Sequence, residues 1–248
     1  MTVAEFFRTG WGIALFTVVA LAIILFVLAV WYRAFTKVVL DFLIALITVI
    51  VLSPCIITCA VIVKYRTDKA LTRQYCVGKG GKIIYLHTFA YCENKEGKPS
   101  RISKSSLSRL PYLFDVLAGK MSIIGPSVIS YKDSCFIDDE PYARFDVRPG
   151  IINPAITKLA ERPSYDVLFS LDCEYAKKYN LFKDIYVLIY ELLLIIRGDR
   201  LDLSSRKISY SDELLSQGQI TEDDVREAEE SETQAIIDSS RAKFRVQN

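Results

Sequence analysis

Two long apolar runs dominate the first quarter of the chain. The first, WGIALFTVVALAIILFVLAVW from Trp11 to Trp31, holds no charge over 21 residues. At a helical rise of about 1.5 Å per residue, such a run spans about 30 Å of hydrocarbon. Tyr32 and Arg33 follow it, as is typical of a membrane boundary, and no small-residue cleavage site comes after it. The pattern favours a transmembrane anchor over a cleaved signal peptide.

The second run, VVLDFLIALITVIVLSPCIITCAVIVKY, carries Asp41 near its start and Ser53-Pro54 in its middle. Proline removes a backbone hydrogen bond and clashes with the preceding turn, so we expect a sharp bend there. Basic residues flank both ends of the run: Arg33, Lys37, Lys64, Arg66, Lys69 and Arg73. Because basic flanks stay on the cytoplasmic side, we expect a re-entrant segment that leaves the membrane on the side it entered. A spanning helix with a proline kink is the alternative, and it leaves one basic flank on the wrong side.

From about Leu71 the pattern becomes that of a globular domain. QYCVGKGGKIIYLHTF predicts two strands joined by a glycine turn, because the VGKGGK stretch lacks the spacing of a phosphate-binding P-loop and the Ser/Thr after its lysine. The apolar period from Leu107 to Leu117 predicts a helix, and Gly119 suits its C-terminus. The prolines and glycines of IGPSVIS and VRPGIINP predict loops.

The last third of the chain predicts helices. Two of them join near Asn180, and the second, from Ile185 to Ile196, is apolar on nearly all faces but too short to span a membrane. It is expected either inside the domain or at the membrane surface. The tail from Thr221 begins with acidic residues and ends with basic ones, an order that complements a helix dipole. We expect a weakly amphipathic helix that is either solvated or in contact with a partner.

Composition narrows the function further. The chain has 248 residues with a net charge of +2, and its basic residues are spread out, so no nucleic-acid partner is expected. Six cysteines without a CxxC pair and a single histidine, His87, do not predict a zinc site or a disulfide framework. His87 is interpreted as a structural or surface residue.

From about Lys37 to Leu203 the chain resembles the bacterial sugar transferases, the monotopic polyprenyl-phosphate phosphoglycosyl transferases that start glycan assembly on a membrane carrier. The resemblance rests on the order of several motifs: the membrane segment broken at Ser53-Pro54, RQ..VGKGGK (Arg73 to Lys82), SL..LP.LF.VL.G.MS..GP (Ser106 to Pro126), RPGI (Arg148 to Ile151), and LD..Y....NLF.D followed by RGD (Leu171 to Asp199). No single motif is specific, but the series is. The resemblance implies a re-entrant membrane helix, in agreement with the flanking charges.

The family's chemistry starts from an Asp-Glu pair in an SLDELPQ-like motif, where the Asp attacks a nucleotide-activated sugar and the Glu helps to hold Mg²⁺. This chain reads SLSRLPY, with Ser108 in place of the Asp and Arg109 in place of the Glu. Arginine cannot bind a cation, and Ser108 has no histidine nearby in the sequence to activate it. The resemblance therefore implies that the active site has been dismantled, so that no cofactor is expected, and Mg²⁺ only if the chain is active.

Other polar positions of the family are also lost, while the apolar ones are kept. The substituted positions are Ser127 in the family's GPRP loop, Thr88 and Ala90 in its KFRTM-like strand, and Ile152, Asn153, Pro154 and Ile156 after RPGI. The matching apolar and turn positions are Leu107, Leu110, Pro111, Leu113, Phe114, Val116 and Leu117. The residues that remain as candidates for residual ligand binding are Arg73, Lys79, Gly125, Pro126, Arg148, Pro149 and Gly150.

These observations predict an α+β membrane protein of a bacterial inner membrane. Its expected parts are a transmembrane anchor (1–36), a re-entrant helix-break-helix (37–66), a small cytoplasmic α/β domain like that of phosphoglycosyl transferases (67–205) and a C-terminal helical tail (206–248).

Three functions stay open on the sequence alone. The leading hypothesis is an inactive homologue that serves as partner or scaffold of an active phosphoglycosyl transferase, as a hetero-oligomer or a self-pair, with polyprenyl phosphate or nucleotide sugar as residual ligands. The second is an active transferase with relocated carboxylates. Candidates for these are Asp115, interpreted as solvated or capping, and the loop acids Asp133, Asp138, Asp139 and Glu140. The third is a membrane adaptor that acts through the tail.

Overall fold

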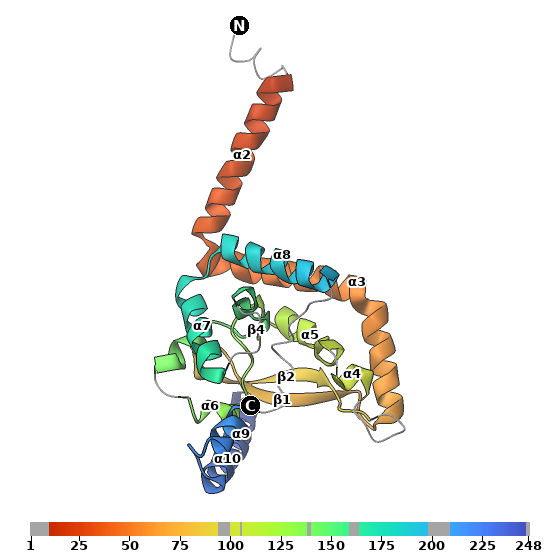
Figure 1. The fold of residues 1–248 in the computed structure, drawn as a ribbon. Helices are drawn as coiled ribbons and strands as arrows, with labels where there is room; N and C mark the ends of the chain where they lie inside the picture. The colour runs from red at the N-terminus through yellow and green to blue at the C-terminus, as the bar shows by residue number, and fades with distance from the viewer. Residues whose placement is uncertain are drawn as a thin grey trace.

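The structure is a computed structural model that describes residues 10–93, 100–104, 106–137, 140–158, 164–197 and 209–246. Helix α2 (Gly10–Val30) is uncharged, and its side chains are largely exposed. Figure 1 shows it projecting away from the rest of the chain. A short π-helical turn (Tyr32–Thr36) joins it to α3 (Lys37–Arg66). Both α2 and α3 are long and apolar enough to cross a membrane.

Helix α3 contains Pro54, and its ribbon bends in the middle (Figure 1). The first half runs beside α8 (Leu181–Arg197), and the second half turns down toward the strands. The bend predicted at Ser53-Pro54 is therefore present, although the helix continues through it without interruption. Ser53 Oγ donates to the Ile50 carbonyl, 2.8 Å away, which satisfies an acceptor in the turn before the proline.

Two small sheets form the rest of the frame. Strands β1 (Leu71–Val77) and β2 (Ile83–Phe89) are antiparallel, with Leu71 opposite Phe89. They are joined by a turn (Lys79–Gly81) in which Gly80 has a φ of +72°. This confirms the predicted strand, glycine turn and strand. Strands β3 (Ser122–Ile124) and β4 (Gly150–Ile152) pair in parallel.

The helix predicted from Leu107 to Leu117 is split, so this prediction is wrong in part. A 3₁₀ turn (Ser106–Arg109) comes first, and α5 (Tyr112–Leu117) begins only after Pro111. The proline has no N–H to donate to the preceding turn, which explains the division. Gly119, with a φ of +73°, follows the end of α5 as predicted.

The remaining elements are short pieces and four further helices. They are α4 (Arg101–Lys104), α6 (Tyr131–Ser134), the 3₁₀ turns η4 (Glu140–Asp146) and η5 (Pro154–Thr157), α7 (Tyr165–Lys178), α8, α9 (Tyr210–Ser216) and α10 (Glu222–Val246). The predicted junction near Asn180 is confirmed, and the Asn180 side chain accepts the Lys183 N–H at 2.9 Å, as expected where a new helix begins.

Both halves of α3 contribute to one hydrophobic core. Ala45 from the first half and Val63 from the second are fully buried, in the same cluster as Leu86 of β2 and Val116 of α5. A second cluster packs α9 against α7, through Tyr210 and Phe169, whose rings lie 5.0 Å apart. The bent helix is therefore part of the domain along its whole length.

Helix α8 has two faces. Leu181, Val187 and Glu191 are buried against the domain. The other face exposes a continuous row of large apolar side chains: Phe182, Ile185, Tyr186, Ile189, Leu192, Leu193 and Ile196. A row with this spacing on one side of a helix is suited to a membrane surface.

The tail forms a helix, as predicted, and it contacts the chain's own domain. Ala228 of α10 is buried, and Lys132 of α6 donates to Glu229 at 3.3 Å.

Candidate functional site

Ser108 and Arg109 are the last two residues of the 3₁₀ turn before α5, and both are partly exposed. The turn packs against β2. Burial raises the pKa of the neighbouring Tyr112, while the positive charge of Arg109 opposes that rise. The position that holds two carboxylates in the resembled family therefore carries a hydroxyl and a fixed cation.

The candidate residues Gly125-Pro126 and Arg148-Pro149-Gly150 are brought into direct contact. The Gly150 N–H donates to the Pro126 carbonyl at 2.9 Å, and the Gly125 N–H donates to the Ile152 carbonyl at 3.1 Å. A Cβ atom on Gly150 would lie 2.1 Å from the Gly125 nitrogen. Only glycine fits where the two loops cross, which gives a packing reason for both motifs.

The other two candidates lie on the hairpin. The Arg73 guanidinium on β1 lies 5.1 Å from the centre of the Tyr85 ring, and the Lys120 ammonium lies 3.6 Å from the same centre. Lys79 is exposed in the glycine turn. Gly81 of that turn lies against Tyr142 of η4. Arg73 is thus engaged with an aromatic ring rather than with the crossing loops.

A buried network not predicted from the sequence holds the loop after Pro126. Asp172 of α7 is fully buried and accepts hydrogen bonds from Arg144 Nη2 (2.7 Å), Asn153 Nδ2 (2.9 Å) and the Ser127 N–H (3.2 Å). Arg144 also donates to the Ser127 carbonyl at 2.8 Å. Its guanidinium carbon lies 4.4 Å from the centre of the Phe169 ring. Ser127, at the family's arginine position, is therefore tied into the domain interior.

Asp115 is neither solvated nor a helix cap, so this interpretation was wrong. Its side chain is 1% exposed, and it accepts the His87 backbone N–H at 2.6 Å. It also contacts His87 Nδ1 at 2.9 Å and the Lys120 ammonium at 3.0 Å. The carboxylate joins α5 to the edge of β2, and its partners occupy its oxygens. His87 accordingly has a structural contact, as expected.

The one loop acid whose side chain the structure describes also makes structural contacts. Asp133 is buried and accepts from the Ser211 N–H at 3.0 Å and the Ser211 hydroxyl at 2.8 Å, which fixes α9 to α6. Asp138, Asp139 and the side chain of Glu140 lie outside the described residues. Across the part of the chain that the structure describes, no three His, Cys, Asp or Glu side chains come together in a way that could hold a metal ion.

The positions that depart from the family pattern take ordinary structural roles. Ala90 is buried and its N–H donates to the Ala70 carbonyl at 3.0 Å, which extends the hairpin. Thr88 is partly exposed on β2. Pro154 starts η5, and Asn153 caps that turn by accepting the Ala155 N–H at 2.7 Å. The side chain of Ile156 lies outside the described residues.

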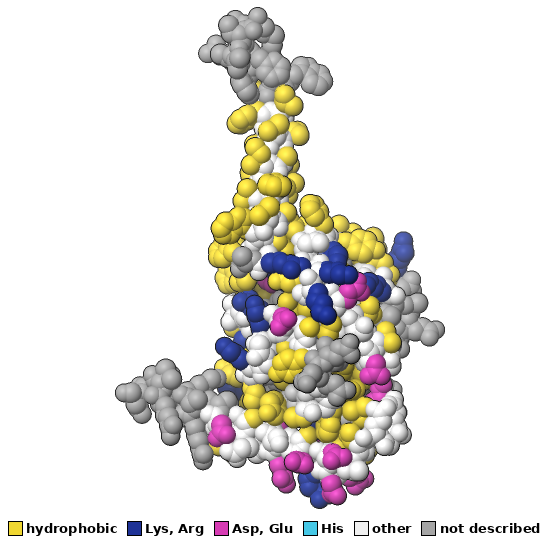
Figure 2. All heavy atoms as spheres, turned by 90° about the vertical axis from the view of Figure 1, so that its left-hand side faces the viewer, with side chains coloured by type: hydrophobic (Ala, Val, Ile, Leu, Met, Phe, Trp, Pro, Cys, Tyr) yellow, Lys and Arg dark blue, Asp and Glu magenta, His cyan; other side chains and the backbone are white. Residues whose placement is uncertain are grey.

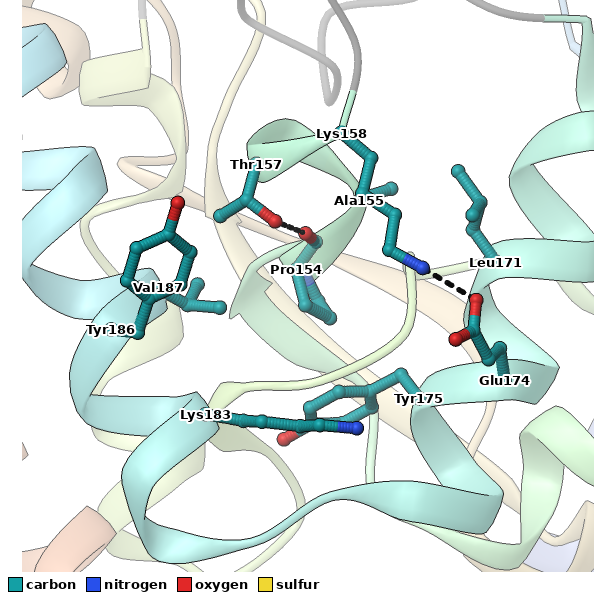
Figure 3. Close-up of a pocket in the computed structure, with 10 residues that line it drawn as sticks. All are labelled: Pro154, Ala155, Thr157, Lys158, Leu171, Glu174, Tyr175, Lys183, Tyr186 and Val187. Carbon is teal, nitrogen blue, oxygen red and sulfur yellow. Dashed lines mark hydrogen bonds and ion pairs between the residues drawn. The ribbon is translucent and has the colours of Figure 1, made fainter.

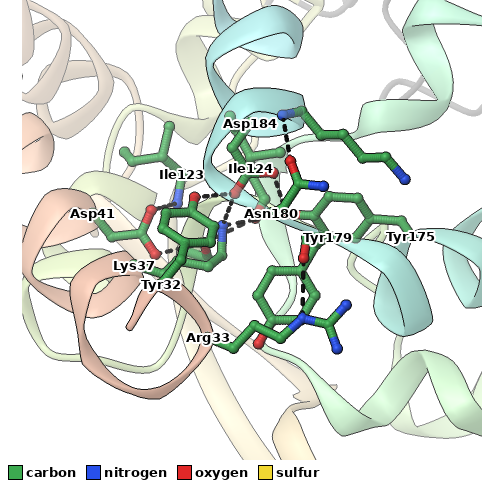
Figure 4. Close-up of polar contacts among 12 residues, drawn as sticks. Tyr32, Arg33, Lys37, Asp41, Ile123, Ile124, Tyr175, Tyr179, Asn180 and Asp184 are labelled. Atoms are coloured by element: carbon green, nitrogen blue, oxygen red, sulfur yellow. Dashed lines mark hydrogen bonds and ion pairs between the residues drawn. The ribbon is translucent and has the colours of Figure 1, made fainter. Parts of the chain in front are cut away.

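A cluster of charged and aromatic side chains joins α3 and the turn before it to the domain (Figure 4). The Lys37 ammonium lies 2.5 Å from Asp184 of α8, which also accepts from the hydroxyls of Tyr32 and Tyr175. Asp41 accepts from the Ser122 hydroxyl at 2.6 Å and the Ile123 N–H at 3.1 Å. The one acid inside the second apolar run is therefore satisfied by β3 rather than placed in lipid.

Comparison with known proteins confirms the resemblance to the bacterial sugar transferases. Residues 31–198 match the family model of the bacterial sugar transferases. The match covers most of the chain, which therefore belongs to the bacterial sugar transferase family.

Three relatives illustrate the family. The chain is 27% identical over 191 residues to a UDP-N-acetylgalactosamine-undecaprenyl-phosphate N-acetylgalactosaminephosphotransferase of Aeromonas hydrophila, covering 66% of this chain and 44% of the relative. It is 32% identical over 99 residues to an undecaprenyl-phosphate galactose phosphotransferase of Salmonella typhimurium, covering 40% and 21%. It is 24% identical over 197 residues to a UDP-glucose:undecaprenyl-phosphate glucose-1-phosphate transferase of Xanthomonas campestris pv. campestris, covering 66% and 40%. The chain spans less than half the length of each of these relatives.

Proposed function

We propose that this chain is a catalytically inactive sugar transferase homologue that serves as partner or scaffold of an active phosphoglycosyl transferase in bacterial polysaccharide or glycoconjugate biosynthesis. The observation that carries the proposal is the SLSRLPY motif, in which Ser108 and Arg109 replace the Asp-Glu pair expected from the family. Related chains are named as transferases that use undecaprenyl phosphate. This chain retains their scaffold without the carboxylates.

The site does not fit the Mg²⁺ that the family implies. Arg109 presents a permanent positive charge where a metal ligand is needed, and Mg²⁺ requires oxygen ligands. Asp115 and Asp133, the two relocation candidates whose side chains are described, are buried and bonded to other elements. These contacts favour the inactive function over an active enzyme with relocated carboxylates.

A pairing role is supported by what the chain keeps. The crossing of Gly125 and Gly150, the hairpin and the bent α3 preserve the packing of the domain although the polar chemistry has changed. A protein that retains a family's surfaces can still associate with another member through them. The contact between α10 and α6 makes a tail that acts independently of the domain less favoured.

We also propose that α2 spans the membrane and that α3 is re-entrant, with the domain on the cytoplasmic side. Ala45 and Val63, on opposite sides of Pro54, both pack into the core of one domain. If α3 crossed the bilayer, that domain would need to contact it on both sides of the membrane. The contacts of both halves of α3 with one core therefore support the re-entrant arrangement over a spanning one.

The topology can be tested by labelling single cysteines in sealed vesicles of known orientation with a membrane-impermeant maleimide. Phe35→Cys and Lys69→Cys flank α3, and both positions are exposed. We expect both to react from the same side. Reaction from opposite sides would establish a spanning α3 and overturn the re-entrant arrangement.

The function can be tested by transfer of radiolabelled sugar phosphate. The full chain is purified in nanodiscs with undecaprenyl phosphate, Mg²⁺ and a panel of UDP-sugars, first alone and then with an intact homologue from the same organism. We expect no product from the chain alone and more, or more sustained, product from the homologue when this chain is added.

Product from the chain alone would overturn the inactive function. If the homologue is unaffected and does not co-purify with this chain, the pairing role is rejected. The variant Ser108→Asp/Arg109→Glu is a useful control. We expect it to stay inactive, because Ser127, Thr88 and Ala90 also depart from the family pattern.

A further inference from the structure

A pocket of about 270 Å³ lies between η5, α7 and α8. Figure 3 shows Pro154 and Val187 at its apolar wall, the Tyr186 ring beside them, and the Lys158 and Lys183 side chains reaching across it from different elements. Pro154, one of the positions that depart from the family pattern, lines it, but Ser108, Arg109 and the residues named for residual ligand binding do not.

The charged residues that line this pocket are two lysines, Lys158 and Lys183, and one acid, Glu174. The Lys158 ammonium lies 2.5 Å from Glu174, and both side chains are about half exposed. The hydrogen bond from Lys158 lowers the pKa of Glu174, with further contributions from Lys178 and Lys183. The structure records no hydrogen bond of the Lys183 ammonium within the residues that it describes. Lys158, Lys178 and Lys183 therefore all lower the pKa of Glu174.

The pocket opens at the border of the apolar face of α8. Lys183 and Tyr186 lie one turn apart on that helix, and Tyr186 belongs to the exposed row, next to Val187 on the buried side. Figure 2 shows Lys and Arg side chains gathered directly beneath the apolar surface on this side of the molecule. Arg33 is another cation in this region, because it donates to the carbonyls of Lys177 and Tyr179.

We propose that this pocket binds the phosphate group of an anionic membrane phospholipid. The two lysines hold the phosphate, and the glycerol and upper acyl chain lie against Tyr186 and Val187. An amphiphile is favoured over a soluble anion because the cations lie at the edge of an apolar face, as basic residues do where a protein meets an anionic leaflet. The proposal rests on the membrane placement of α8, but not on the absence of catalysis.

The test compares lipid retention by the full chain. Protein is reconstituted in nanodiscs of phosphatidylcholine with or without phosphatidylglycerol and released into mild detergent. Native mass spectrometry then counts the phospholipids that remain bound. Lys158→Gln/Lys183→Gln removes both cations, and Lys64→Gln/Lys69→Gln is the matched control, since both of its lysines are exposed elsewhere.

We expect wild type and the control to retain phosphatidylglycerol in preference to phosphatidylcholine, and the pocket variant to lose that retention by about tenfold or more. Lys158→Arg/Lys183→Arg should keep it, because the charges remain. Equal losses in the pocket variant and the control would show a general charge effect and overturn the site. Equal retention of both lipids by wild type would do the same.

Competition distinguishes other sources of phosphate. Displacement of phosphatidylglycerol by equimolar undecaprenyl phosphate would assign the pocket to the polyprenyl carrier and overturn a phospholipid site. Displacement by inorganic phosphate would show that the apolar wall contributes nothing and would also overturn it. Because lipid retention is measured without sugar transfer, failure here is separate from failure of the proposed function.

Discussion

The Arg144–Asp172 pair should be among the most sensitive points of the domain. Arg144→Met removes the guanidinium and leaves Asp172, which is fully buried, with the Asn153 amide and the Ser127 N–H as its remaining donors. Methionine fills much of the space beside Phe169. The main effect of Arg144→Met is therefore to leave the buried carboxylate of Asp172 without a positive charge beside it.

Removing one member of a buried ion pair costs about 3–5 kcal/mol. For a chain of 150–250 residues, each kcal/mol shifts the melting temperature by about 2–4 °C, so Arg144→Met should lower it by about 6–20 °C. The exposed pair Arg226–Asp223 on α10, 3.4 Å apart, supplies a matched control. Arg226→Met should change the melting temperature by no more than about 4 °C, because a surface pair contributes about 0–1 kcal/mol.

The loss should also depend on pH. Burial raises the pKa of Asp172, and Arg144 is the largest influence that opposes this rise. Without Arg144 the folded-state pKa rises further above the unfolded value of about 3.9. A carboxyl group with a raised folded-state pKa binds protons more readily in the folded state, so its stabilising contribution is complete below the unfolded pKa and is lost as pH rises through the folded pKa. The deficit of Arg144→Met should therefore be smaller at pH 5 than at pH 8.

Thermal unfolding followed by circular dichroism, in one detergent and at one heating rate, measures all of these values. A melting temperature of Arg144→Met within 2 °C of Arg226→Met, on the scale set by surface pairs, would refute the assignment of a required counter-charge. A deficit that does not shrink toward pH 5 would show that the carboxylate of Asp172 is not its source.

Three further predictions concern packing, burial and membrane contact. Gly150→Ala should cost about 3 kcal/mol or more in a melting experiment, because its Cβ would lie 2.1 Å from the Gly125 nitrogen. A water-soluble maleimide should label the exposed Cys135 in the native protein and Cys76 only after unfolding, since Cys76 is buried and burial raises the pKa of its thiol. In vesicles, and with the exposed Cys55 and Cys135 replaced by serine, Ile189→Cys on the exposed face of α8 should resist the same reagent and react with a lipid-soluble one.

Each of these three predictions has a control at another position of the same chain. Gly80→Ala places its Cβ in open space and should cost only about 1 kcal/mol through its positive φ, so an equal loss at Gly150 would argue against the close crossing. Asp166→Cys, exposed on α7, should react with the water-soluble maleimide in vesicles. Similar rates at positions 166 and 189 would place α8 in water. Rapid native labelling of Cys76 would show that this thiol is not buried in the native protein.

Sequence patterns correctly predicted the elements that depend on residues close together in the sequence. The alternation and three glycines around Lys79 were sufficient for the β1–β2 hairpin, because a turn of this kind depends on residues that can adopt a positive φ. Asn180 marked the start of α8 because its side chain can cap a helix. The helix before Gly119 was less well predicted. Its apolar period continues through Pro111, and the period alone does not show where the hydrogen bonds stop.

Side-chain partners far apart in the sequence could not be predicted in the same way. Asp115 looks like an ordinary helix acid, and only the fold brings His87, 28 positions away, to it. Arg144 and Asp172 are 28 positions apart, and neither stands in a pattern that requires the other. Asp172 belongs to the LD..Y motif, so the resemblance to the family identified this position. It did not identify Arg144 as the partner of Asp172.

Asp41 shows how a sequence signal and a structural one combine. In the apolar run it is an anomaly, since a carboxylate in hydrocarbon costs several kcal/mol unless it has partners. The flanking lysines and arginines suggested that the run returns to its starting side, and Asp41 binds Ser122 and Ile123 of the domain. Asp41, in the first half of α3, contacts β3, and Val63, in the second half, lies in the core. Both contacts are expected of a helix that folds back on one domain. The charge that seemed least compatible with a membrane segment therefore supports the re-entrant arrangement.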